Sequence, residues 1–223
     1  MVMTKTAVFW DIGSCPVPYG YDPCLVGPVI KSELKRSGIS GPITITALGK
    51  LKLIPTDVLK SLSSSGIALR NVSQGLGGIV ACLLVWKFRN TAPANLMVIS
   101  NLKLEPDVEV EPHIFKNLVS ELSLKGNRLL WAYPCVPSEP SCFSAVVSKT
   151  WLWTSLLEAP VDDSDHELVV SKDKCVLSRP WYCSVCHVEC HSFEDFTTHL
   201  KSEQHDKREL HFLGLIEHQQ TNV

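Results

Sequence analysis

The sequence predicts an α/β protein with a mostly parallel sheet covered by helices on both faces, followed by a small zinc finger. Short apolar runs alternate with segments of helical periodicity between residues 7 and 133. Strands that are buried on both faces of a sheet have this continuous apolar character. Paired cysteines and histidines at finger spacing follow near the C-terminus. A length of 223 residues accommodates one full domain and a small module.

Each element has its own sequence signal. Asp22 followed by Pro23 predicts the start of the first helix, which Pro28 would kink or restart. Thr56 is the predicted N-cap of the second helix, and Gly66 ends it. The other two helices are predicted over residues 75–86 and 114–122, and the five strands over residues 7–10, 43–48, 67–72, 96–99 and 129–133.

The carboxyl ends of the strands mark the predicted site. In open parallel sheets, ligands bind where the loops from these ends converge. Asp11 ends the first strand, whereas residues 73–75 and 100–101 after the third and fourth strands are polar but uncharged.

Charge is distributed unevenly along the chain. Residues 1–137 hold 14 Lys and Arg against 9 Asp and Glu, a balance of +5, while residues 138–223 hold 7 against 14, a balance of −7. A polyanionic partner is therefore expected to meet the N-terminal part. The candidate RNA-binding residues are Lys31, Lys35, Arg36, Lys50, Lys52 and Lys60.

The sequence also indicates where in the cell the protein is located. The longest uncharged apolar run, residues 76–86, is much shorter than the roughly 20 residues of a membrane span. No signal-peptide pattern opens the chain, so a cytoplasmic or nuclear location is expected.

Nine cysteines, an odd number, favour reduced thiols and one metal site over a disulfide framework.

The metal site is predicted from the spacing Cys183-x2-Cys186-x12-His199-x5-His205, which is typical of a Cys2His2 finger. Two thiolates and two imidazoles can close a tetrahedron around a structural Zn²⁺. Ser192 and Asp195 form a candidate capping box, so a helix is expected from about residue 193. The five residues between the histidines predict a kink or loosening before His205. The neighbouring Cys190, His187 and His191 are interpreted as bystanders.

Residues 8–18, with the sequence VFWDIGSCPVP, resemble the opening of NYN domains, the PIN-like ribonuclease-fold family, in particular the limkain-b type found in the meiosis regulator and mRNA stability factor. The resemblance extends through residues 41–47, 62–67, 93–100 and 129–134. It implies a PIN-like fold and metal-dependent RNA hydrolysis, in which several carboxylates at the strand ends hold Mg²⁺ or Mn²⁺.

The chain departs from the acidic pattern of that family. Asp11 matches the first family acid, but Gly13-Ser14 stands where Glu-Asn is usual, and residues 77–82 contain no acid. Residues 101–105, NLKLE, replace the third acidic cluster. Asp11 is therefore either a residual metal ligand or a cap on neighbouring backbone, and a shifted register could bring in Glu105, Asp107, Glu109 or Glu111.

The finger, with Trp181-Tyr182 before it and Lys207-Arg208 at its end, resembles U1-like or matrin-like fingers, several of which contact double-stranded RNA. Residues 181–223, however, hold 3 basic against 7 acidic side chains. This balance favours a structural or protein-binding role.

The predicted organisation is a NYN domain over residues 1–137, a linker over 138–180, the finger over 181–212 and a tail over 213–223. The linker contains the acidic residues 162–165 and Trp151-Leu152-Trp153, whose tryptophans either pack between domains or stack on bases or a partner. The leading hypothesis is a catalytically degenerate protein that acts in RNA-linked regulation of gene expression by binding RNA or protein. The alternatives are an active endoribonuclease that uses Mg²⁺ or Mn²⁺ and a protein-interaction module without RNA contact. Peroxisome association is implied by the resemblance alone, since residues 221–223 are not a peroxisomal address.

Overall fold

The computed structural model describes residues 4–73, 75–101, 112–136, 145–160 and 180–220. These residues form seven α-helices and one eight-stranded sheet with the order β6-β5-β4-β1-β2-β3-β7-β8. Every neighbouring pair is parallel except β7 with β8. The predicted α/β class with a mostly parallel sheet is confirmed.

The first half of the chain alternates strands and helices as expected. Its elements are β1 (Thr6–Asp11), α1 (Pro23–Arg36), β2 (Ile43–Gly49), the 3-10 turn η1 (Leu51–Leu53), α2 (Thr56–Ser64), β3 (Ala68–Asn71), α3 (Gly75–Arg89) and β4 (Asn95–Ile99). The second half contains α4 (Pro112–Leu124), β5 (Arg128–Tyr133), β6 (Val147–Leu152), α5 (Trp153–Leu157), β7 (Trp181–Cys183), β8 (Val188–Glu189), α6 (Phe193–Leu200) and α7 (Glu203–Gln220).

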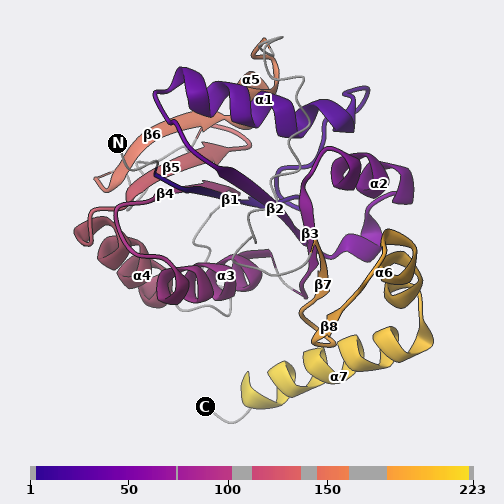
Figure 1. Ribbon diagram of the computed structural model, residues 1–223. Coiled ribbons are helices and arrows are strands. Elements are labelled where there is room, and N and C mark those ends of the chain that lie inside the picture. The colour runs from indigo at the N-terminus through magenta and orange to yellow at the C-terminus, as the bar shows by residue number, and fades with distance from the viewer. Residues whose placement is uncertain (1–3, 74, 102–111, 137–144, 161–179, 221–223) are drawn as a thin grey trace.

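The sheet separates two layers of helices. Helices α1, α2 and α5 cover one face, and α3 and α4 cover the other (Figure 1). Successive side chains of a strand point to opposite faces, so Val8 and Trp10 of β1 pack under α1 while Ala7 and Phe9 pack against α3. Both faces of the central strands are thus buried, as their apolar runs predict.

The predicted start of the first helix is confirmed, and the predicted N-cap of the second helix is wrong. The Asp22 side chain accepts a hydrogen bond from the backbone N–H of Cys24 at 2.9 Å, with Pro23 as the first helical residue. Helix α1 continues through Pro28. Thr56 is not an N-cap: Pro55 holds that position, and Thr56 is the first residue of α2.

The sequence predicts a linker over residues 138–180. In the structure, part of this segment forms a strand and a helix of the main domain. Strand β6 pairs in parallel with β5, and α5 follows it directly. Trp153 is 2 % exposed and packs on Trp10 with ring centroids 5.1 Å apart. Because β6 is an edge strand with exposed positions, its sequence lacks the continuous apolar run of the inner strands. The acidic residues 162–165 lie outside the described residues.

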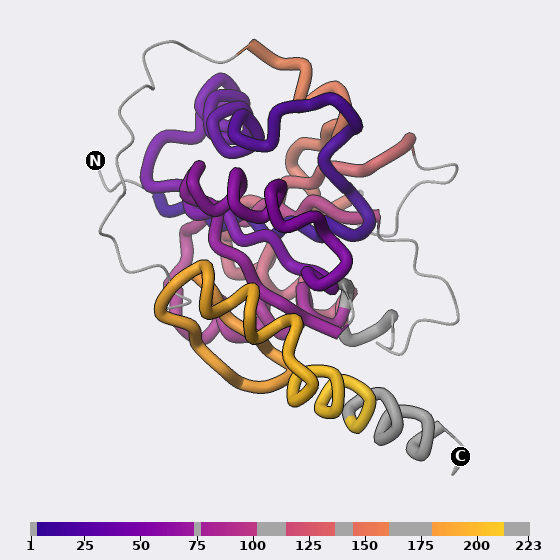
Figure 2. The backbone as a smooth tube through the Cα atoms, turned by 90° about the vertical axis from the view of Figure 1, so that its right-hand side faces the viewer, coloured from indigo at the N-terminus to yellow at the C-terminus, as the bar shows by residue number. Residues whose placement is uncertain are grey.

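Residues 181–212, the predicted finger, extend the same sheet. Strand β7 pairs in parallel with β3 and covers its edge. Cys183, Phe196 and Leu200 belong to the hydrophobic core that lies under α1 and α2. Figure 2 shows the finger against the side of the domain that carries η1 and α2, consistent with the contacts of α6 with both. Within the described ranges, no helix has the length and apolar character needed to cross a membrane.

Candidate metal centre and strand-end site

The four residues of the finger motif converge on one point. The candidate ligand atoms of Cys183, Cys186, His199 and His205 all lie within 4.8 Å of one another. Cys183 ends β7, and Cys186 follows in the turn before β8. The two histidines come from α6 and α7. The residues predicted from sequence as metal ligands therefore meet in space, in a group that can hold a metal ion.

The distances agree with tetrahedral coordination. Nδ1 of His205 lies 3.3 Å from Sγ of Cys186 and 3.7 Å from Sγ of Cys183. Zinc–sulfur and zinc–nitrogen bonds at a tetrahedral angle place two such atoms about 3.5 Å apart. Nε2 of His199 is buried and has no hydrogen-bond partner among the described residues. A metal ion would satisfy this nitrogen, so the donor set fits Zn²⁺.

The protonation states of the ligands depend on their burial. Burial, followed by the neighbouring Cys183, raises the pKa of the Cys186 thiol to about 11. Without a metal this thiol keeps its proton at neutral pH, and metal binding would release it. Burial, with the charges of His205 and Arg208, lowers the pKa of His199. A neutral imidazole is the form that binds a metal.

A set of outer contacts orients the ligands. Nε2 of His205 lies 3.8 Å from the Glu209 carboxylate, one turn further along α7. The Asn71 side-chain amide donates to Sγ of Cys183 at 3.6 Å. Arg208 donates to the carbonyl of Cys186 at 3.3 Å. Such outer contacts fix the orientation and basicity of metal ligands.

Asn71 also connects the finger to the domain. Its side-chain oxygen accepts from the N–H of Leu51 at 2.9 Å, and its carbonyl accepts from the N–H of Ser184 at 2.8 Å. The residue is buried at the end of β3. Sequence reasoning missed Asn71 and Glu209. A polar residue at the end of a buried strand is the only local signal for the first, and the i, i+4 spacing from His205 is the signal for the second.

The helices of the finger follow the predicted pattern. The Ser192 hydroxyl accepts from the N–H of Asp195 at 3.0 Å and begins α6 at Phe193. Helix α6 ends at Leu200, and α7 begins at Glu203, so the expected interruption between the two histidines is present. Cys190, His187 and His191 are outside the metal-ligand group, in agreement with their interpretation as bystanders.

At the strand-end site, Asp11 caps the loop that follows it. One carboxylate oxygen accepts from the N–H of Gly13 at 3.0 Å and of Ser14 at 3.3 Å, and the other accepts from the hydroxyl of Ser100 at 3.4 Å. Asp11 is 7 % exposed. Both oxygens thus have protein partners, which is the arrangement of a carboxylate that stabilises a turn.

Two serine hydroxyl groups, those of Ser14 and Ser100, lie near Asp11. The Ser14 hydroxyl lies 3.4 Å from that of Ser100 and accepts from the N–H of Asn101 at 3.0 Å. Burial raises the pKa of the nearby Cys15 to about 12, so this thiol is not a nucleophile at neutral pH. Among the described residues, the Cys–His group is the one metal-ligand cluster. Glu105, Asp107, Glu109 and Glu111 lie outside the described residues.

The six candidate RNA-binding residues fall into separate groups. Lys50 and Lys52 are at η1, which follows the carboxyl end of β2, and Lys60 is on α2. Lys31, Lys35 and Arg36 lie on the second half of α1, which runs back along the sheet, so its end lies at the opposite edge. Arg36 pairs with Glu33 at 3.2 Å, and Lys52 pairs with Asp206 of α7.

Comparison of this chain with protein-family models and with curated proteins found no match.

Proposed function

We propose that this chain binds RNA without cleaving it and acts in RNA-linked regulation of gene expression. Its α/β domain is proposed to be a degenerate member of the PIN-like NYN type that residues 8–18 resemble. The finger is proposed to be a structural zinc unit held by Cys183, Cys186, His199 and His205.

The observation that carries this proposal is the hydrogen bonding of Asp11. Hydrolysis of a phosphodiester by a divalent ion requires several oxygen ligands gathered around that ion. The Asp11 carboxylate instead accepts hydrogen bonds from Gly13, Ser14 and Ser100. These hydrogen bonds take up three of the roughly four lone-pair positions of the carboxylate, which supports a structural role over binding of Mg²⁺ or Mn²⁺.

Binding of RNA is supported by charge. The balance of +5 over residues 1–137 favours a polyanion on the domain, since phosphate contacts by Lys and Arg dominate affinity for nucleic acids. The zinc would contribute to folding only: it would join β7, α6 and α7 through two thiolates and two imidazoles, with no open position for a substrate.

The test is an incubation of the purified full chain with single-stranded RNA and Mn²⁺, in parallel with a binding titration over a range of salt concentrations. We expect salt-sensitive binding and intact RNA. The Asp11→Asn variant serves as the control because the amide keeps an oxygen for the loop N–H groups. Cleavage that EDTA and Asp11→Asn both abolish would instead establish the endoribonuclease alternative. An absence of salt-sensitive affinity would support the protein-interaction alternative.

A further inference from the structure

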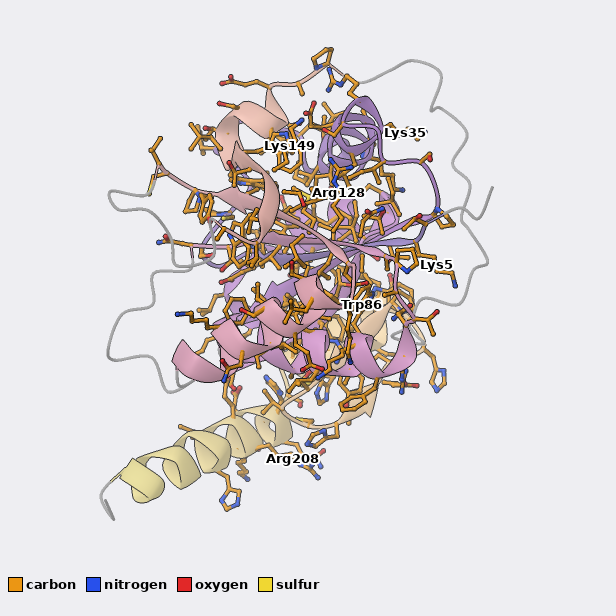
Figure 3. The ribbon with its side chains drawn as sticks, turned by 90° about the vertical axis from the view of Figure 1, so that its left-hand side faces the viewer. Lys5, Lys35, Trp86, Arg128, Lys149 and Arg208 are labelled. Carbon is orange, nitrogen blue, oxygen red and sulfur yellow. The ribbon has the colours of Figure 1, made fainter. Side chains whose placement is uncertain are left out.

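The edge from which the parallel strands start is basic. Figure 3 looks onto this edge and labels four of its cations, Lys5, Lys35, Arg128 and Lys149, around the ends of the sheet. We define the amino edge as the residues that begin β1, β5 and β6 and the last turns of α1, α3 and α4. Its described cations are Lys5, Lys35, Arg36, Lys87, Arg89, Lys125, Arg128 and Lys149.

Two carboxylates accompany these eight cations in the described part of this edge, which leaves a balance of +6. Each carboxylate is shared by two cations. Glu33 lies 3.2 Å from Arg36 and 3.5 Å from Lys149. Glu121 pairs with Lys87 and with Lys125. One negative charge between two positive charges leaves each trio positive, so pairing does not neutralise the edge.

The cations of the strands form a row. Strands β6, β5, β4 and β1 are consecutive in the sheet, and neighbouring strands lie about 4.8 Å apart. Arg128 starts β5 beside Asn95 of β4, which in turn is beside Thr6. Lys5 directly precedes Thr6, and Lys149 lies on β6. A row of cations along one edge suits a linear polyanion.

Aromatic rings lie next to these charges. Phe88 is 82 % exposed at the end of α3, between Lys87 and Arg89, and Lys87 Nζ lies 5.7 Å from its ring centroid. Lys149 Nζ lies 4.6 Å from the ring of Trp151. Trp151 is partly buried against the core, so Phe88 is the exposed ring of the two. An exposed ring among cations is the arrangement on which single-stranded nucleic acids stack their bases.

The opposite edge has a different character. At the carboxyl ends of the strands and the first turns of α1 and α2, the cations Lys50, Lys52 and Arg70 are offset by Asp11, the N-cap Asp22 and Asp57. The finger lies at this end, where Lys52 pairs with its Asp206. The described finger residues hold three basic and six acidic side chains. A phosphate backbone therefore meets less attraction there.

We propose that single-stranded RNA binds along the amino edge, with Lys5, Arg128 and Lys149 contacting phosphates and Phe88 stacking on a base. This inference rests on the proposed function and deepens it, because it places the RNA on the edge opposite Asp11. RNA bound there would lie away from the strand-end site that a nuclease of this topology would use.

The test compares two triple variants of the full chain that lose equal charge. Lys5→Gln, Arg128→Gln and Lys149→Gln together remove the three proposed phosphate contacts of the amino edge, and Lys50→Gln, Lys52→Gln and Lys60→Gln together are the matched control. Binding of fluorescein-labelled oligouridine is followed by anisotropy. The amino-edge variant should lose about tenfold or more in affinity, and its slope of log affinity against log salt should fall by about 2, since each lost phosphate contact contributes about 0.7. The control should change affinity less than about twofold.

A second pair of variants tests the stacking contact. Phe88→Ala should weaken binding about fivefold or more. Tyr19→Ala, which removes a fully exposed ring from the loop after β1, should leave it unchanged. Circular dichroism and zinc content establish that each variant is folded.

The outcomes separate this inference from the proposed function. If oligouridine binds and only the Lys50, Lys52 and Lys60 variant loses affinity, the amino edge is not the site, while RNA binding stands. If the unmodified chain does not bind oligouridine, both fail. Failure to bind oligouridine together with amino-edge-dependent binding to anionic phospholipid vesicles would assign the edge to a membrane surface and overturn the inference.

Discussion

The two edges of the sheet differ in how their polar and charged side chains are paired. At the carboxyl edge the polar groups are occupied by one another: Asp11 caps its own loop, and Asn71 joins Leu51, Ser184 and the thiol of Cys183. At the amino edge, two carboxylates are shared among four cations, and further Lys and Arg side chains surround them. The first arrangement stabilises the fold, and the second has an excess of positive charge among the described residues.

This contrast changes how the resemblance to nucleases is interpreted. In an open parallel sheet, the carboxyl edge is the expected place for a ligand. Here it carries the turn of Asp11 and the attachment of the finger, whereas the excess positive charge lies at the other edge. Under the proposed function, RNA would therefore bind at a different edge of the sheet from the one that a nuclease of this topology would use.

The largest expected effect is that of removing the proposed zinc ion from the predicted finger. In small zinc modules the metal contributes roughly 10 to 16 kcal/mol of apparent folding free energy. Chelation, or the Cys183→Ser variant, should abolish stoichiometric zinc and the amide protection of α6 and α7, while β1 and β4 stay protected. Metal analysis and hydrogen exchange measure both.

Cys24→Ser is the matched control, because this exposed thiol lies outside the metal group. Zinc content that is unchanged in Cys183→Ser would show that the ligand assignment is wrong. Loss of protection across the whole sheet would show that the carboxyl edge depends on the metal more widely than its contacts indicate.

A smaller effect is expected at Asn71. Asn71→Ala leaves the N–H of Leu51 and the thiol of Cys183 without their partner, and a buried unsatisfied group costs about 1 to 3 kcal/mol. Urea denaturation should show this loss in the free energy of unfolding. Asn101→Ala, at an exposed position of the same edge, should stay within about 0.5 kcal/mol of the unmodified chain. Equal effects of the two substitutions would contradict the bridging role.

The smallest effect concerns Glu33 at the amino edge. Burial alone would raise the pKa of Glu33, but the hydrogen bond from Trp151 and the charges of Arg36 and Lys149 outweigh it and hold the pKa below its ordinary value. A lowered folded-state pKa contributes stability above the unfolded-state pKa, and this contribution is lost as pH falls through the folded-state value.

Glu33→Gln should therefore reduce the free energy of unfolding by under about 1 kcal/mol near neutral pH. The difference from the unmodified chain should disappear in acid below the folded-state pKa of Glu33. A difference that grew on acidification would contradict this sign. Since the substitution removes a carboxylate from the amino edge, it should also strengthen oligouridine binding slightly.

Local signals in the sequence predicted much of the fold. Strands β1, β4 and β5 contain continuous apolar runs, and β2 begins with alternating Ile and Thr. The Asp22-Pro23 and Ser192 caps begin their helices as expected. The four candidate metal ligands were also predictable, because they all lie within residues 183–205, which form a short hairpin and parts of the two helices that follow it. The place of Thr56 was predicted wrongly by one position, since Pro55 provides the N-cap.

Contacts between distant segments could not be predicted in this way. Strand β7 has three residues and pairs with β3, more than 100 positions earlier. Lys149 lies in a segment whose polar positions resemble a linker, yet β6 brings it to Glu33. Counting charge along the chain assigns Lys149 to the acidic half, whereas the strand order places it with Arg128 and Lys5 on the basic edge.

The most direct test of RNA binding at the amino edge is ultraviolet crosslinking of bound oligouridine, followed by identification of the crosslinked peptides. We expect crosslinks in the peptides that contain Phe88 and Arg128, both at the amino edge. Crosslinks confined to the loop that contains Tyr19 and to the peptide that contains Lys50 would place the RNA at the carboxyl edge and contradict this expectation.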